Sequence, residues 1–302
     1  MPRTTLHRRA ITLVETIIVL LVVAGIFVLI LPQLACTRCS APQIKCGTQV
    51  RNVIQAMTIF AQGNRDMYPL PSQLDVNNQT VAMGVAGDAT TQRGKDTLDN
   101  MMSILVFNSS ISPELLWSPS EVNGNIQVHQ GYQNANPTAA VSPAKAVWDP
   151  SLRADFTTGV GHISYAALMS DGDPKAALDQ PAAGRLRHWS NTFGATEAIF
   201  GNRGPLVTGR DAKGNILYDR KSNTMRIHGP KSTWEGNIGY NDNHVNFEAA
   251  MDPAEITYTI AGGTRPDIFF FDEPDNTDGL NANLGIWVQA GNKPSEFKGI
   301  HD

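Results

Sequence analysis

The feature that most constrains this chain is a long apolar segment close to its N-terminus. Residues 11–31 contain one charged side chain, Glu15, and a short basic leader with Arg3, Arg8 and Arg9 precedes them. At about 1.5 Å per residue, such a segment forms a helix of roughly 30 Å, the thickness of a bilayer's hydrocarbon core. The sequence therefore predicts a transmembrane helix over residues 11–31.

Charge predicts how such a helix would be oriented. The basic leader favours a cytoplasmic N-terminus, so a single-pass protein of the inner (cytoplasmic) membrane is expected, with its C-terminal domain periplasmic or extracellular. The lipid bilayer is then a partner. The whole chain has a net charge of −4 and no cluster of Lys and Arg beyond the leader, so nucleic acid is not an expected partner.

The junction between leader and apolar segment carries a resemblance. Ala10 is small, Ile11-Thr12-Leu13-Val14 follows it, and Glu15 is the fifth residue from Ile11. This pattern resembles the prepilin cleavage and methylation site of type IV pilins and type II secretion pseudopilins. The family usually has Gly before the cut, where this chain has Ala10. The resemblance implies that prepilin peptidase cleaves between Ala10 and Ile11 and that Ile11 is then N-methylated.

A carboxylate inside an apolar segment is costly unless it has a partner. Cleavage before Ile11 would create an α-amine with an ordinary pKa of about 8. Such an amine attracts Glu15 strongly at low dielectric, and each group offsets part of the other's desolvation cost. A pair between Glu15 of one subunit and Ile11 of a neighbour would set the register of a filament. The alternative is an uncleaved signal anchor that tolerates the acid.

A second helical pattern follows the apolar segment. Residues 43–62 place apolar side chains at helical spacing, which predicts an amphipathic helix whose apolar face packs on a domain. Between the apolar segment and this helix, Pro32 is expected to kink the chain and Pro42 to interrupt the helix. We therefore expect a leader at 1–10, an N-terminal helix at 11–63 and an extracytoplasmic domain at 64–302. The helix, with Cys46, and the Tyr68-Pro69 pair after it resemble the large pilin-like class.

Beyond residue 150 the pattern changes to short apolar runs between turn residues. Strands are expected at 162–168, 196–200, 215–218, 237–240, 245–248, 256–260, 268–271 and 284–288, and a short helix, or a helix running into a strand, at 98–107. The expected fold class is α+β and pilin-like: a long N-terminal transmembrane helix packed on an antiparallel β-sheet with long loops.

Three cysteines lie just after the apolar segment. Cys36, Cys39 and Cys46 are the only ones in the chain. A zinc site lacks a nearby histidine, and a thioredoxin-like redox pair lacks the surrounding βαβ pattern. A structural disulfide in an oxidising compartment remains, with the choice of partners open. The segment around Ser118 resembles the Leu-x-Cys-Pro-Ser element of the pilin-like class, with Ser118 at the position of its cysteine.

Two C-terminal segments carry candidate metal ligands. Asp242-Asn243 between apolar runs predicts a β-hairpin and resembles the Asp-Gly-His-Val element of the pilin-like class. A metal site there would need His244, Asp242 and a third ligand, either His228 or His162. The acidic run from residue 272 departs from the EF-hand pattern. A looser calcium site using Asp275 and Asp278 is the alternative to a solvated turn, because some major pseudopilins hold calcium in a C-terminal loop.

These observations together predict a structural subunit of a type IV pilus or type II secretion pseudopilus. The chain would be a substrate of prepilin peptidase and not itself an enzyme, and its partners would be other pilin or pseudopilin subunits. One alternative is a membrane-anchored binding protein that does not polymerise. The other is a membrane-tethered, metal-dependent hydrolase built around His244.

Overall fold

A computed structural model describes residues 13–170, 185–229, 232–260, 262–273, 281–289 and 297–302, and for residues 26–40 and 260 it describes the backbone only. Contacts divide the chain into two compact units, one up to Ile44 and one from Lys45 to Asp302. The boundary lies inside the first helix, so the last part of that helix belongs to the second unit.

The first helix, α1, runs from Leu13 to Gln62. It continues through the position of Pro42, where the sequence predicted an interruption. It ends where Gly63, Asn64 and Asp66 donate backbone hydrogen bonds to Phe60 and Ala61. Two further helices follow, α2 (Pro71–Leu74) and α3 (Leu98–Phe107), so the helix expected at 98–107 is confirmed.

The prediction of a membrane-spanning helix has to be corrected. Within the residues that the structure describes, no helix is long and apolar enough to cross a bilayer. The transmembrane and single-pass assignments are therefore withdrawn.

The centre of the second unit is a five-stranded sheet of order β6-β5-β2-β1-β9 in which neighbouring strands pair antiparallel. Its strands are β1 (Tyr165–Leu168), β2 (Ala198–Asn202), β5 (Gly236–Tyr240), β6 (Val245–Glu248) and β9 (Leu284–Gly285). The three central strands, β1, β2 and β5, are buried along their whole length, as expected for a sheet covered on both faces.

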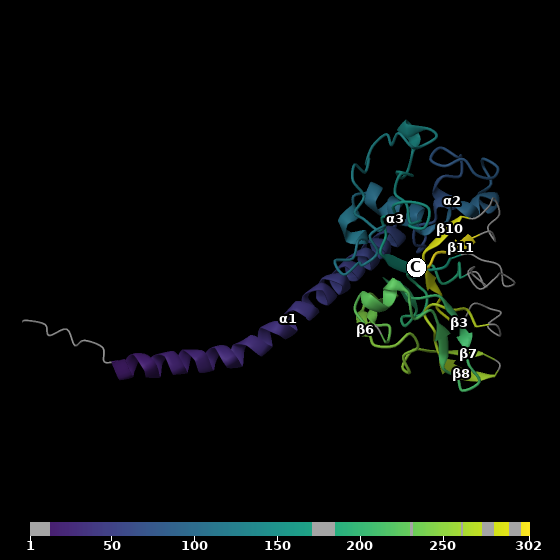
Figure 1. Cartoon of the computed structure of the whole chain (residues 1–302). Coiled ribbons are helices and arrows are strands. Elements are labelled where there is room, and N and C mark those ends of the chain that lie inside the picture. Colours follow the sequence, from purple (N-terminus) through teal and green to yellow (C-terminus); the bar gives the residue numbers. More distant parts are fainter. Residues whose placement is uncertain (1–12, 171–184, 230–231, 261, 274–280, 290–296) are drawn as a thin grey trace, which may run out of the picture. The chain divides into compact units, whose positions relative to one another are not determined.

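Three two-stranded sheets complete the unit. They pair β3 (Val207–Arg210) with β4 (Ile216–Tyr218), β7 (Thr257–Ile260) with β8 (Gly263–Pro266), and β10 (Trp287–Gln289) with β11 (Phe297–Gly299). Figure 1 shows β3, β7 and β8 at one end of the unit and α2, α3, β10 and β11 towards the other. The fold is thus α+β with antiparallel sheets.

The part of α1 that belongs to the second unit, residues 45–62, packs on the main sheet. Val50, Ile54 and Met57 are fully buried. A Cβ built on Gly239 of β5 would lie 2.1 Å from Ile54 Cδ1, so the absence of a side chain lets the strand approach the helix closely. Tyr165 of β1 donates a hydrogen bond of 2.9 Å to Gln49 Oε1. This part of α1 is a central element of the core.

The predicted strand at residues 268–271 is wrong. These four side chains are buried, but the segment makes single hydrogen bonds, Phe269 N to Met251 O and Leu284 N to Phe269 O, and no ladder. An apolar run shows that a segment is buried, and it does not by itself show that the segment is a strand.

Candidate functional site

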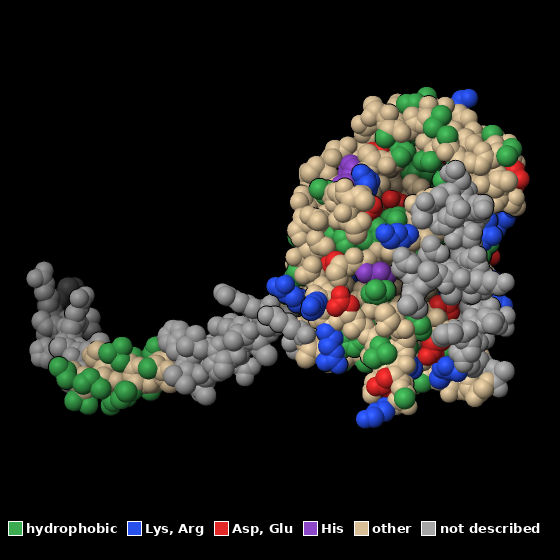
Figure 2. Space-filling model, turned by 45° about the vertical axis from the view of Figure 1, so that its right-hand side comes forward, with side chains coloured by type: hydrophobic (Ala, Val, Ile, Leu, Met, Phe, Trp, Pro, Cys, Tyr) green, Lys and Arg blue, Asp and Glu red, His purple; other side chains and the backbone are tan. Residues whose placement is uncertain are grey.

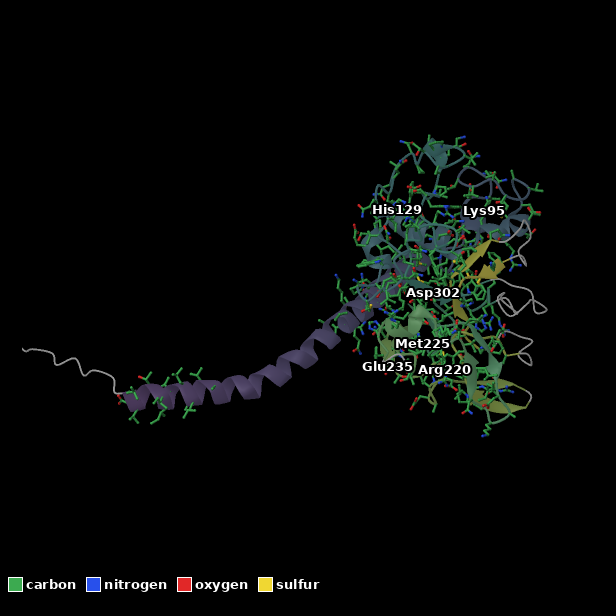
Figure 3. The ribbon with its side chains drawn as sticks, viewed as in Figure 1. Lys95, His129, Arg220, Met225, Glu235 and Asp302 are labelled. Carbon is green, nitrogen blue, oxygen red and sulfur yellow. The ribbon has the colours of Figure 1, made fainter. Side chains whose placement is uncertain are left out.

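The apolar N-terminal part of α1 is the largest exposed apolar feature that the structure describes. Nine large apolar side chains are more than two-fifths exposed, and Leu13 reaches 75%; they are Leu13, Val14, Ile17, Ile18, Val19, Leu20, Leu21, Val22 and Val23. Figure 2 shows these apolar side chains as green atoms, and in Figure 3 they point to several sides of the helix. A helix that is apolar all round normally lies buried, so this segment is a candidate for contact with a partner.

The predicted processing site adjoins this segment. Ala10 and Ile11 lie outside the described residues, so the structure leaves the cleavage and methylation predictions as they stand. Glu15 lies in the first turn of α1, where a carboxylate interacts favourably with the helix dipole. The helix therefore brings the acid next to the exposed apolar side chains.

The cysteines fall in different environments. The side chains of Cys36 and Cys39 lie outside the described residues, so their pairing stays a prediction. Cys46 is a buried free thiol, and its Sγ lies 2.8 Å from the Oγ of Ser118. Ser118, the residue that the resemblance to the pilin-like class sets in the place of a cysteine, thus lies directly against Cys46.

The β-hairpin at Asp242-Asn243 is confirmed. β5 and β6 pair antiparallel on either side of it, and Asn243 has a positive φ of 70°. His244 forms a hydrogen bond with Asp242 through Nδ1, and its ring stacks on Tyr240 at 4.4 Å. The hydrogen-bonded turn accounts for the positions of Asp242, Asn243 and His244.

The histidines proposed as further metal ligands lie elsewhere. The ring of His162 lies 4.5 Å from that of His129, and His228 packs edge-to-face on Phe247. Across the described ranges no group of three potential ligands is close enough to hold a metal ion. The structure therefore does not bring His244 and Asp242 together with a third histidine, and the metal site predicted for these residues is corrected. Asp275 and Asp278 lie outside the described residues.

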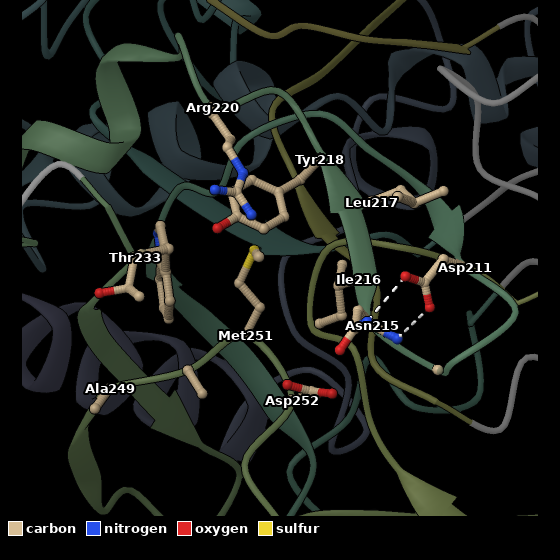
Figure 4. Close-up of a pocket in the computed structure, with 13 residues that line it drawn as sticks. Asp211, Asn215, Ile216, Leu217, Tyr218, Arg220, Thr233, Ala249, Met251 and Asp252 are labelled. Atoms are coloured by element: carbon tan, nitrogen blue, oxygen red, sulfur yellow. Dashed lines mark hydrogen bonds between the residues drawn. The ribbon is translucent and has the colours of Figure 1, made fainter.

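An open pocket of about 490 Å³ lies beside the β3–β4 hairpin (Figure 4). Arg220 lies with its guanidinium 5.5 Å from the centre of the Tyr218 ring, and Thr233 and Met251 line the same space. The carboxylate of Asp211 accepts hydrogen bonds from Asn215. The lining thus combines polar, charged and apolar side chains.

Arg203 forms a buried ionic cluster that the sequence did not reveal. Its guanidinium lies 2.6 Å from Glu121 and 2.7 Å from Asp302. Burial by itself would lower the pKa of Arg203, but the two carboxylates outweigh this effect and raise it. Because the charges satisfy one another, the cluster fastens the Glu121 segment to the sheet and has a structural role.

The chain was also compared with known protein families, proteins and structures. No family model, no curated protein and no solved structure matches this chain.

Proposed function

We propose that this chain is a structural subunit of a filament of the type IV pilus or type II secretion pseudopilus kind. The observation that carries the proposal is the exposed apolar surface of α1 from Leu13 to Val23, with Glu15 among these residues. Burying apolar surface contributes roughly 25 cal/mol per Å², so many helices packed together would gain substantially from covering this surface.

The proposed assembly uses Glu15 as a register device. After cleavage by prepilin peptidase between Ala10 and Ile11, the new α-amine of one subunit pairs with the Glu15 carboxylate of another. The apolar side chains around it exclude water, which strengthens the attraction between the two charges. Packing then supplies the affinity, and the ion pair selects the axial offset between neighbouring helices.

The experiment is expression of the full chain with and without a prepilin peptidase, followed by N-terminal sequencing and electron microscopy of sheared fractions. We expect a chain that starts at N-methylated Ile11 and forms filaments only in the presence of the peptidase. The variant Glu15→Ala should be cleaved and should not form filaments. The exposed Glu255 provides a matched control, because Glu255→Ala removes the same charge from the surface of the compact unit. Normal filaments from Glu15→Ala would exclude the register role.

The pocket beside β3 and β4 favours a second candidate, a binding protein that does not polymerise. Its volume of about 490 Å³ falls within the range typical of small-molecule sites. Under this alternative the processed chain stays monomeric, and Arg220→Ala weakens ligand binding without affecting processing. Filament formation by the wild-type chain separates the two candidates.

A further inference from the structure

The side chain of Lys95 is fully buried at the end of the 3-10 turn Ala89–Lys95, and it lies among oxygen atoms (Lys95 is labelled in Figure 3). Its Nζ lies 2.7 Å from Asn78 Oδ1 and 3.0 Å from Asp75 Oδ2. It also lies 2.6 Å from the backbone oxygen of Asp75 and 3.0 Å from Gln92 Oε1. An amine, a carboxamide and a carboxylate therefore meet at one buried point.

The first requirement for a reaction between amine and carboxamide is proximity. The contact of 2.7 Å between Lys95 Nζ and Asn78 Oδ1, together with a C=O bond of about 1.23 Å, places the Asn78 carbonyl carbon within about 4 Å of the amine. Atoms held at roughly 3–3.5 Å from each other react much faster, because the entropy cost of bringing them together has already been met by folding. To present its carbon to the amine, the Asn78 carboxamide has to turn about its Cβ–Cγ bond, which releases the hydrogen bond of 3.4 Å from Asn78 Nδ2 to Gly84 O.

The second requirement is a neutral amine and a group that takes its proton. Burial lowers the pKa of Lys95, although Asp75 and Asp96 partly oppose this effect. Desolvation is a recognised way to turn a lysine into a nucleophile. Asp75 Oδ2 lies 3.0 Å from Nζ and can accept its proton. The backbone N–H groups of Gln79, Thr80 and Val81 donate hydrogen bonds to the Asp75 carboxylate and hold it in place.

The third requirement is a donor for the charge that develops on the amide oxygen. The backbone N–H of Met83 donates to Asn78 Oδ1 at 3.3 Å. A fixed donor at this position stabilises negative charge on the oxygen when the carbon is attacked. Asn78 itself has a positive φ of 56° and is held by its loop, so its carboxamide is presented to the lysine by the backbone.

We propose that Lys95 and Asn78 join through an intramolecular amide bond, with Asp75 as the catalytic proton carrier. Asp75 takes a proton from the Lys95 ammonium, and the neutral Nζ attacks the Asn78 carbonyl carbon. A proton passes from Nζ through Asp75 to Nδ2, the bond from the carbon to Nδ2 breaks, and ammonia leaves. One C–N bond forms and one breaks, so the step needs no oxidant, reductant or further reactant.

The bond would tie the loop that follows α2 to the end of the 3-10 turn Ala89–Lys95. All three side chains belong to the compact unit that begins at Lys45, so the proposal does not depend on filament formation. A covalent tie suits a domain exposed to mechanical or proteolytic stress, because local opening of the loop could no longer release its two ends.

The test is a tryptic map of the purified full chain by high-resolution mass spectrometry. We expect a branched peptide in which residues 66–93 are joined to residues 94–145, with a mass one ammonia below the sum of the two. Trypsin should not cut after Lys95 but should cut after the exposed Lys145 in the same digest, which provides an internal control. A succinimide at an asparagine also loses ammonia, but it would leave Lys95 open to trypsin.

Two variants complete the test. Lys95→Arg keeps the positive charge and should abolish the branched peptide, and Asp75→Asn should abolish it by removing the proton carrier. Complete cleavage after Lys95 in the folded wild-type chain, with residues 66–93 at their unmodified mass, would overturn the proposal. The wild-type map decides this question by itself, so a variant that fails to fold leaves the result intact.

Discussion

The two parts of helix α1 use apolar residues in opposite ways. Between Val50 and Ala61 the apolar residues lie mostly on one face, and Val50, Ile54 and Met57 are fully buried in the core. Between Leu13 and Val23 apolar residues surround the helix, and their side chains are exposed. The apolar side chains of the first part are covered by other residues of the same chain. The second leaves apolar surface exposed, and this exposed surface is the basis of the proposed assembly.

The largest expected effect concerns the buried part. Ile54→Ala should lower the free energy of unfolding by about 2–5 kcal/mol, because it leaves a cavity between α1 and β5, where Gly239 lies against Ile54. Urea unfolding of the full chain, monitored by tryptophan fluorescence, measures the change. A loss below about 1 kcal/mol would contradict the central place of this helix in the core.

The next effect concerns the contact between Cys46 and Ser118. Ser118→Cys should form a disulfide with Cys46 and raise the free energy of unfolding by about 2–4 kcal/mol, because it closes a long loop in the unfolded chain. Thiol titration and thermal unfolding with and without reductant test this expectation. The double variant Cys46→Ser with Ser118→Cys is the control, since it keeps one thiol at the site. Thiols that remain free under oxidising conditions would show that the two side chains do not face each other.

A smaller effect depends on pH and concerns the compact unit alone. Burial, followed by the neighbouring His129 and Arg153, lowers the pKa of His162 from 6.5 to about 4. The unfolded chain therefore binds a proton between about pH 6.5 and 4 that the folded chain does not, so stability should fall as the pH falls through this window. Because His162 is partly exposed, we expect a loss on the order of 1–2 kcal/mol.

The variant His162→Asn should flatten this pH dependence, since the asparagine oxygen can still accept the hydrogen bond from Arg153 N. His244→Asn is the matched control, because His244 is more exposed. Unfolding free energies measured at intervals from pH 4 to pH 7 separate the two variants. An unchanged slope in His162→Asn would assign the acid sensitivity to other groups.

The smallest effect on stability is expected in the exposed part of α1. Ile18→Ala removes as much side chain as Ile54→Ala, but Ile18 is 55% exposed, so the free energy of unfolding should change by no more than about 0.5 kcal/mol. The same urea experiment compares the two variants directly. A loss similar to that of Ile54→Ala would show that residues 13–23 fold against the rest of the chain.

Local patterns in the sequence predicted much of the fold. The α3 helix and the β5–β6 hairpin follow from side-chain spacing and from a turn residue that tolerates positive φ, and both were correct. Strands β3, β8 and β11 were missed, because each contains at most one large apolar residue and so lacks the apolar run on which the prediction of strands relied. The run at residues 268–271 was misassigned because burial and strand pairing are separate properties.

The sites were less predictable. The group of Lys95, Asn78 and Asp75 consists of polar residues in a segment without periodicity, and only the path of the loop brings them together. Glu121, Arg203 and Asp302 lie far apart in the chain, so no local pattern could reveal their cluster. Ser118 was different, since the resemblance to a cysteine element singled out this position before the structure placed it against Cys46.

The central claim is that the exposed apolar side chains of residues 13–23 mediate self-association. The most direct test compares two double variants of the processed full chain by sedimentation and electron microscopy. Ile18→Ser with Leu21→Ser removes exposed apolar surface from this segment, whereas Ile44→Ser with Ile59→Ser removes similarly exposed surface from the later part of α1. We predict that the first variant stays monomeric and the second assembles like the wild-type chain. Assembly of the first variant at wild-type levels would contradict the claim.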